Sequence, residues 1–340
     1  MGKERGAVEG WLKSLQSYFE MRNFLWVDGS LDPSVSTRVE NLKQVDQGIL
    51  HAAQLKTQEA HARDVKILRA HSHIWVLPED GFSSGDKHRS VRVMEQVRWV
   101  YKGSGQYDVE ARMIEHRQIW EQSAATWRLS VQHTSDELNP LFPLPMSGTP
   151  SLGSVPLKEL RNDRTLQTIE GNPHYNRVHS LRYAELWWNR SHPRFVHLRD
   201  DCTNFISQCL WAGGTPMQMS PSRARGWWYQ WNQPVETEPW SFSWTTADAL
   251  FRYLLQNFGA KQVVSVRELR IGDLVFYDWD GEGHYHHTTF VVDFDAKGDP
   301  LVNAHTDASY HRHYRYQDSR AWSHKTRYVF VQIPEVFPAR

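Results

Sequence analysis

The sequence of 340 residues predicts an α+β protein in two domains, because helical and strand patterns occur in separate blocks. In each half of the chain, apolar residues at helical spacing come first, and alternating or β-branched segments follow. Between the halves, residues 135–156 are rich in proline and glycine, as linkers and extended crossovers are. We therefore predict a smaller accessory domain over residues 1–134, a linker over 135–171 and a second domain over 172–335.

The first domain is expected to contain two helices followed by an antiparallel meander. Helical spacing runs from Val8 to Phe19 and stops at Asp28-Gly29, and a second helix is expected over residues 39–53. Strand patterns occupy residues 65–76, 91–101, 107–119 and 127–131. This order of elements resembles that of the cone-shaped NTF2-like fold.

The second domain repeats this order, with helices before strands. Helices are expected over residues 176–189, 201–212 and 246–258. Strands are expected over residues 273–277, 287–294, 301–305 and 328–333. Helices followed by an antiparallel sheet again indicate an α+β domain.

The charge balance gives no reason to expect a nucleic acid or an anionic membrane as partner, because the numbers of basic and acidic residues are equal, at 39 each. No stretch approaches the ~18 consecutive apolar residues that a membrane span requires. Residues 1–22 lack the apolar segment of a secretory signal. As encoded, the protein is expected to be cytoplasmic, with association to a spore or envelope as the other location considered.

The sharpest chemical feature is Asp201-Cys202 at the start of an amphipathic helix. We expect Asp201 to cap the helix by accepting hydrogen bonds from its first N–H groups. The helix dipole would then lower the pKa of the Cys202 thiol, and the same N–H groups would form an oxyanion hole. Cys202 is therefore the candidate nucleophile, and the alternative is a small buried core residue. Cys209 is expected only to pack, and at ~10.5 Å along the helix axis it is too far from Cys202 for a disulfide.

A histidine cluster supplies candidate bases, because His284, His286 and His287 lead into the apolar strand segment 288–292. Successive strand side chains point to opposite faces, so only one of His286 and His287 can meet Cys202. We choose His287 as the base and keep His286 as the alternative.

A third polar residue is expected at the end of the partner strand, where it would orient the base. His305 is the candidate, and Asn303 competes with it because it lies on the same strand face. Zinc bound by the histidine cluster with Asp280 or Glu282 is a further alternative, but His-x-His-His matches no recognised metal spacing. We therefore predict neither a metal nor another cofactor.

Sixteen tryptophans are unusual, and several fall between Trp211 and Trp244. Such a cluster lines a substrate groove or fills a core. The substrate-binding candidates are Trp227, Trp228 and Trp244, together with Asn204 near the candidate nucleophile.

An ordered series of motifs extends over roughly residues 172–335. Its segments are Tyr175-Asn176-Arg177, Tyr183-Ala184, Trp187-Trp188-Asn189, the Asp201 to Cys209 run, Ala212-Gly213-Gly214, Gly226-Trp227-Trp228-Tyr229, Ser243-Trp244-Thr245, Gly272-Asp273, the His287 segment and Ala304-His305-Thr306-Asp307. This series resembles the "putative amidase domain" family of Bacillus and its relatives.

The resemblance implies a domain similar to the NlpC/P60 and CHAP amidases, with helices packed on an antiparallel sheet in a papain-like α+β fold. It implies Cys202 as nucleophile, His287 as base and His305 as orienting residue. Family members tend to have Asp-His before the apolar strand where this chain has His286-His287, so the base stays open between these two histidines.

The implied activity is that of a cysteine amidase or peptidase. A thiolate attacks an amide or peptide bond, an acyl-thioester forms, and water releases it, while transfer to an amine uses the same site. The implied partner is a peptide or amide substrate, peptidoglycan among the candidates. The alternative is a catalytically inactive amidase-fold module that binds peptide or glycan through its tryptophan-rich surface.

Overall fold

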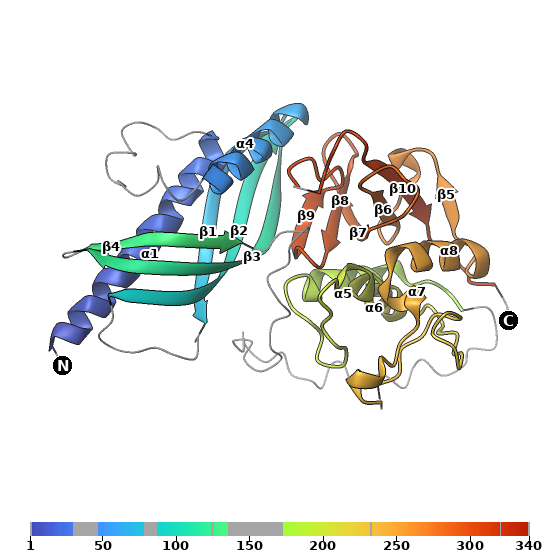
Figure 1. Cartoon of the computed structure of the whole chain (residues 1–340). Helices are drawn as coiled ribbons and strands as arrows, with labels where there is room; N and C mark the ends of the chain where they lie inside the picture. Colours follow the sequence, from blue (N-terminus) through green and yellow to red (C-terminus); the bar gives the residue numbers. More distant parts are fainter. Residues whose placement is uncertain are drawn as a thin grey trace. The chain divides into compact units, whose positions relative to one another are not determined.

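The computed structural model describes residues 2–29, 47–77, 87–123, 126–134, 173–231, 233–319 and 321–338, and it confirms the α+β class (Figure 1). The chain forms two compact units, and each draws on separate stretches of sequence. Unit 1 comprises Met1–Leu141, Asp295–Lys297 and Asp307–Ser323, and unit 2 comprises Phe142–Phe294, Gly298–Thr306 and His324–Arg340. The predicted linker over residues 135–171 lies outside the described residues, as do residues 39–46 of the second predicted helix.

Unit 1 combines two helices with an antiparallel sheet. The helices are α1 (Gly2–Asp28) and α4 (Gln47–Ala62). The strands are β1 (Lys66–Leu77), β2 (His88–Gly103), β3 (Gln106–Ser123), β4 (Thr126–Thr134) and β9 (Ser309–His313). β3 pairs with β2, β4 and β9, and β1 pairs with β2. The four strands predicted in the first half are confirmed, whereas β9 was not predicted.

One face of β2 supplies much of the core of unit 1. Val91, Val93, Val97 and Trp99 are 0% exposed and pack in one cluster with apolar side chains of α1 and α4. Odd-numbered side chains of a strand share a face, so the alternation in this segment places them together. Burial of this stripe is what holds the helices of unit 1 to its sheet.

A buried ion network fastens residues 307–323 into unit 1. The Lys56 ammonium lies 2.6 Å from a carboxylate oxygen of Glu110 and 2.9 Å from one of Asp318. Arg112 contacts both carboxylates, and Arg312 lies 3.0 Å from Asp318. We call these five residues the lysine network. Loss of any one member would leave buried charges uncompensated. Since Arg312 and Asp318 lie in the segment 307–323, this segment is a structural part of unit 1.

A second buried polar group surrounds Glu95 of β2. Its carboxylate lies 3.0 Å from Arg22 and 2.8 Å from Nε2 of His116. Nδ1 of His116 lies 2.7 Å from the amide nitrogen of Gln132, so the neutral ring satisfies both contacts by accepting at Nδ1 and donating at Nε2. Burial, reinforced by the charge of Arg22, lowers the pKa of His116 to about 4. Burial favours a higher pKa for Glu95, but Arg22 and the hydrogen bonds from His116 and Ser72 outweigh it and lower that pKa to about 2.

Unit 1 is expected to lose stability as the pH falls from about 6.5, the ordinary histidine value, toward the lowered pKa of His116, about 4. Over this interval the unfolded chain binds a proton at His116 and the folded chain does not. The full shift corresponds to roughly 3 kcal/mol. Urea unfolding of the parent and of His116→Gln at pH 7 and pH 4.5 measures the effect, and the variant should lose less stability on acidification. Equal losses in the two proteins would contradict this expectation.

Unit 2 packs its helices against one face of its own antiparallel strands. The helices are α5 (Arg177–Trp187), α6 (Cys202–Ala212), α7 (Phe242–Thr245) and α8 (Ala247–Asn257). The strands, in spatial order, are β8 (Pro300–Ala304), β7 (His287–Phe294), β6 (Leu274–Asp278), β10 (Arg327–Gln332) and β5 (Lys261–Val263). The three helices and four strands predicted here are confirmed, and α7 and β5 are additions.

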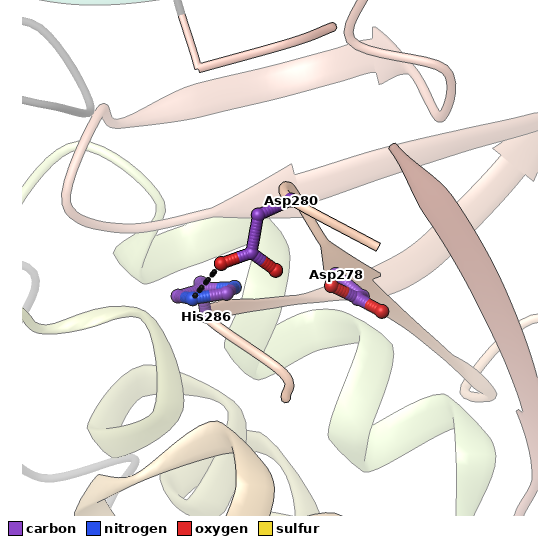
Figure 2. A group of neighbouring side chains, drawn as sticks. All are labelled: Asp278, Asp280 and His286. Carbon is purple, nitrogen blue, oxygen red and sulfur yellow. Dashed lines mark ion pairs between the residues drawn. The ribbon is translucent and has the colours of Figure 1, made fainter. Parts of the chain in front are cut away.

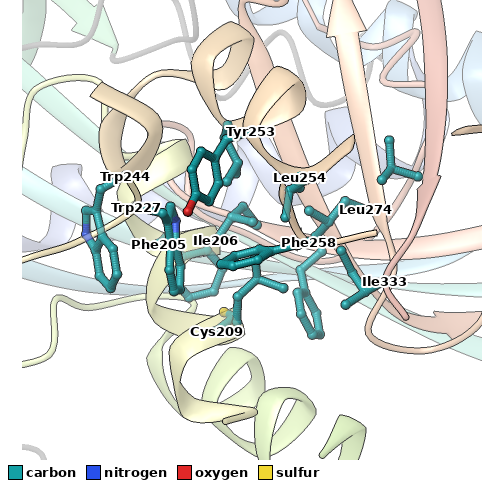
Figure 3. Close-up of a cluster of buried hydrophobic side chains, with 14 of the residues drawn as sticks. Phe205, Ile206, Cys209, Trp227, Trp244, Tyr253, Leu254, Phe258, Leu274 and Ile333 are labelled. Atoms are coloured by element: carbon teal, nitrogen blue, oxygen red, sulfur yellow. The ribbon is translucent and has the colours of Figure 1, made fainter. Parts of the chain in front are cut away.

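The core of unit 2 lies between these helices and the sheet (Figure 3). Phe205 and Ile206 of α6, Leu254 of α8 and Leu274 of β6 are at most 1% exposed and belong to one cluster. Phe290 of β7 joins the same cluster, which places the even-numbered side chains of β7 toward α6.

Among the helices that the structure describes, none combines the length and the apolar character that a membrane crossing requires.

The start of α5 is fastened to the sheet of unit 2 by residues from two of the sequence motifs. Arg177 lies 2.8 Å from Asp273 and donates a hydrogen bond to the backbone oxygen of Ile333. Tyr175 donates to the backbone oxygen of Gly272 at 2.9 Å. Gly272 has a φ of 93°, and a Cβ at this position would meet Arg177 and Tyr175. The Tyr-Asn-Arg and Gly-Asp motifs therefore have a structural explanation.

Candidate active site

Cys202 is the first residue of α6 and is 5% exposed. Its sulfur accepts hydrogen bonds from the backbone N–H of Thr288 and from the hydroxyl of Thr306, and it lies 3.7 Å from the hydroxyl oxygen of Thr203. Burial raises the pKa of the Cys202 thiol, and these hydrogen bonds oppose the shift. The predicted lowering of this pKa is wrong, because burial outweighs the effect of the helix N-terminus.

Asp201 occupies the N-cap position as predicted, but its side chain does not cap the helix. Oδ1 accepts hydrogen bonds from the backbone N–H of Leu198 at 3.0 Å and from the side-chain amide of Asn204 at 2.8 Å. Oδ2 lies 2.6 Å from Nδ1 of His305. The predicted capping bonds are therefore wrong, because tertiary partners hold the carboxylate away from the first turn.

Thr306 provides the cap instead. Its hydroxyl oxygen accepts hydrogen bonds from the backbone N–H groups of Asp201 at 3.0 Å and Cys202 at 3.1 Å. Thr306 directly follows His305, just beyond the end of β8. The helix that carries the candidate nucleophile is thus capped by the end of a strand that comes about a hundred residues later in the chain.

Three neighbours fix the position of the His305 ring. Its ring stacks on Phe205, with centroids 4.0 Å apart and an interplanar angle of 12°. Nδ1 faces Asp201, and Nε2 lies 2.7 Å from the backbone oxygen of Trp187. Both neighbours accept hydrogen bonds, so the ring makes both bonds when it carries a proton on each nitrogen.

The carboxylate of Asp201 lies between two histidines, because His197 approaches it at 3.5 Å in addition to His305. Burial alone would raise the pKa of Asp201, but hydrogen bonds from His197 and His305 outweigh it and hold that pKa well below its ordinary range. Burial disfavours the charged form of His197, yet Asp201 reverses this and raises the pKa of His197. A buried, ionised carboxylate therefore sits immediately before Cys202 in the chain.

His287 is the first residue of β7 and is 4% exposed. Its ring packs beside those of Tyr277 and Trp279, at centroid distances of 5.3 Å and 6.0 Å. The hydroxyl groups of Tyr277 and Thr289 lie 3.3 Å apart, so these residues and His287 share a face of the sheet. The body of α6 packs against the opposite face, through Phe290.

The sulfur of Cys202 lies close to the backbone of β7. It accepts a hydrogen bond from the backbone N–H of Thr288, the residue that directly follows His287. The structure therefore brings the thiol to the beginning of the strand that carries the candidate base.

His286 lies before β7 and is half-exposed. Its Nε2 lies 3.6 Å from Asp280, and Asp278 completes a group whose donor atoms are within 4.8 Å of one another (Figure 2). Asp278 already accepts three backbone hydrogen bonds from the loop that follows it. His284 instead lies 4.0 Å from Asp248, so the zinc alternative with three histidines does not form among these residues.

The predicted substrate-binding tryptophans lie in the core. Trp227 and Trp244 are 0% exposed and Trp228 is 4% exposed. The indole N–H of Trp227 donates to Ser207, and that of Trp244 donates to Asn204, which is itself 0% exposed. These contacts are those of packing residues, and a direct contact with substrate stays a prediction.

Two residues next to the candidate nucleophile were missed. Thr306 appears in the sequence only as part of a motif, and His197 only as one of 18 histidines. A histidine four residues before Asp201 is a weak signal, and nothing local marks Thr306. Asn303, the competitor for the third role, donates through its amide to the backbone oxygen of Ala184 at 3.2 Å.

Comparison with known proteins places the similarity in this half of the chain. The uncharacterized protein YhbB of Bacillus subtilis (strain 168) is 43% identical over 162 residues, which cover 47% of this chain and 50% of that protein. The uncharacterized protein YjcM of the same organism is 24% identical over 151 residues, which cover 43% of this chain and 32% of that protein. No solved structure matches. The region that contains Cys202, His287 and His305, residues 174–331, matches the model of the family described as putative amidase domain.

Proposed function

We propose that the protein is a cysteine-dependent amidase or peptidase in which Cys202 is the nucleophile. One observation carries the proposal: the Cys202 sulfur, at the N-terminus of α6, lies against the Thr288 backbone directly after His287. A thiol at a helix N-terminus beside a histidine-bearing strand is the arrangement that activated cysteines use. The same arrangement supports a relation to the papain-like NlpC/P60 and CHAP amidases.

Among the histidines near Cys202, His287 suits the base best. Both ring nitrogens of His305 are already engaged, at 2.6 Å from Asp201 and 2.7 Å from the backbone oxygen of Trp187, and His286 is half-exposed beside Asp280. His287 is buried at the strand start, where aromatic rings restrict its orientation. We assign His305 the role of holding Asp201, and through it the start of α6, in place of the predicted contact with the base.

The proposed reaction has two steps. His287 takes the thiol proton, the thiolate attacks the carbonyl carbon, the C–N bond breaks, and the proton goes to the leaving amine. His287 then takes a proton from water, the hydroxide attacks the thioester, and the carboxylic acid leaves as the Cys202 thiol is restored. Neither step requires a redox partner.

The test uses p-nitrophenyl acetate as an acyl donor, with intact-mass detection of the acetylated protein after an acid quench. The parent is expected to gain one acetyl group at Cys202 and then lose it, whereas Cys202→Ala gains none. Cys209→Ala is the matched control, because Cys209 is 0% exposed and burial raises its pKa well above the ordinary value. It should keep the reaction and lose roughly 1 kcal/mol of stability. Acetylation that persists in Cys202→Ala would contradict the assignment.

A second candidate is an inactive module of the same fold. It is favoured by the burial of Cys202 and the raised pKa of its thiol. If the protein is an inactive module, the parent should not be acetylated and should not hydrolyse short peptide amides, cell-wall peptides included. Binding of such peptides without turnover would support this second candidate.

A further inference from the structure

Two backbone N–H groups at the start of α6 share a single acceptor. The hydroxyl oxygen of Thr306 lies 3.0 Å from the nitrogen of Asp201 and 3.1 Å from that of Cys202. The same hydroxyl group hydrogen-bonds the Cys202 sulfur. An oxygen held by backbone N–H groups and adjacent to the attacking sulfur is in the position of the oxyanion in acyl transfer.

The backbone of Thr306 is unusual in a way that fits this placement. Its φ is 77°, a region that favours glycine and that β-branched residues rarely adopt. The conformation is kept because the preceding residue, His305, is held at both ring nitrogens and stacked on Phe205. The fold therefore keeps Thr306 in an unfavourable backbone conformation, and this conformation brings its hydroxyl group to the helix N-terminus.

A simple capping role does not account for the arrangement. Asp201 stands at the N-cap position and has a carboxylate of the type that caps helices well. That carboxylate is instead held by His305, Asn204 and the backbone of Leu198. An ionised side chain at the helix start would repel a developing oxyanion, whereas a neutral hydroxyl can move away without leaving a charge behind.

We propose that Thr306 is a positioning residue that occupies the oxyanion site of the free protein and is displaced by the carbonyl oxygen of the substrate. This inference rests on the proposed function. In the free state the hydroxyl keeps the two N–H groups aligned and satisfied. When the substrate binds, its carbonyl oxygen takes both hydrogen bonds, and the departure of Thr306 is part of the cost of binding.

The test compares two reactions of Cys202. Acetylation by p-nitrophenyl acetate passes through an oxyanion, whereas alkylation by iodoacetamide does not, so the ratio of their rates reports on the oxyanion site and not on the thiol. Thr306→Gly removes the hydroxyl and suits the positive φ, and Thr306→Ala removes the hydroxyl but keeps a Cβ. Both are expected to raise the ratio about tenfold, because a site that is blocked most of the time becomes open. Thr306→Ser restores the hydroxyl and is expected to return the ratio to the parental value.

The contrary outcomes are distinct. A ratio that is unchanged in both hydroxyl-free variants reduces Thr306 to a helix cap, and a ratio that falls means that the hydroxyl stabilises the oxyanion; either result overturns the proposal. Thermal unfolding of each variant shows which of them is folded, and a variant that unfolds is replaced by the other in the comparison. If the parent and both hydroxyl-free variants are alkylated but never acetylated, the proposed function itself fails.

Discussion

His287→Ala is expected to lower the rate of Cys202 acetylation by a factor of about a thousand or more, because the thiol then lacks the group that takes its proton. The loss should be large in this protein because burial already raises the pKa of the thiol. Without the base, little thiolate is present at neutral pH. In the same variant, the pH profile of iodoacetamide alkylation should shift to higher pH.

His286→Ala is the matched control for this prediction. The two histidines are adjacent, but His286 lies before β7, is half-exposed and pairs with Asp280 at 3.6 Å. Both the acetylation rate and the alkylation profile of His286→Ala should remain close to those of the parent. A loss in His286→Ala with a parental profile in His287→Ala would reverse the assignment of the base.

Lys56→Ala is expected to cost about 3–5 kcal/mol of unit 1 stability, because it leaves the carboxylates of Glu110 and Asp318 buried beside each other without the ammonium between them. Asp318→Ala should destabilise the same unit, since Asp318 contributes to the lysine network from the distant segment 307–323. Hydrogen exchange of the amides in β2 and β3 measures the effect where it arises. Exchange there should accelerate by a factor of a hundred or more, on the order of 10² for 3 kcal/mol.

Lys66→Ala is the matched control, because Lys66 is exposed at the start of β1. It should change exchange in β2 and β3 little. Parental exchange in Asp318→Ala would show that residues 307–323 are not needed by unit 1.

Elements with a local pattern could be predicted from the sequence. The apolar run after His287 predicted β7, and the amphipathic segment after Asp201 predicted α6 with Cys202 at its start. The strand β9 carries the sequence Ser-Tyr-His-Arg-His, which has no apolar alternation, so its pairing with β3 is decided by tertiary contacts. Propensity and periodicity do not contain such information.

The parts of the site that escaped prediction depend on distant partners. Asp201 follows the local rule for an N-cap in position, but His305, 104 positions later, takes its carboxylate. The raised pKa of Cys202 follows from burial, which a sequence pattern does not measure. Likewise, Lys56 and Asp318 are separated by 262 positions, and no rule that reads neighbouring residues links them.

Because unit 1 is built from separate stretches of the sequence, it cannot be completed early in translation. Its strands β1 to β4 leave the ribosome early, but the segment Asp307–Ser323 that completes the lysine network is translated only after nearly all of unit 2. At ordinary elongation speeds, this delay is on the order of ten seconds or more. During that time Lys56, Glu110 and Arg112 can pair with one another but lack Asp318 and Arg312, so the lysine network is incomplete. Neither unit is complete until these late segments are made, because residues 324–340 of unit 2 follow residues 307–323 of unit 1 in the chain.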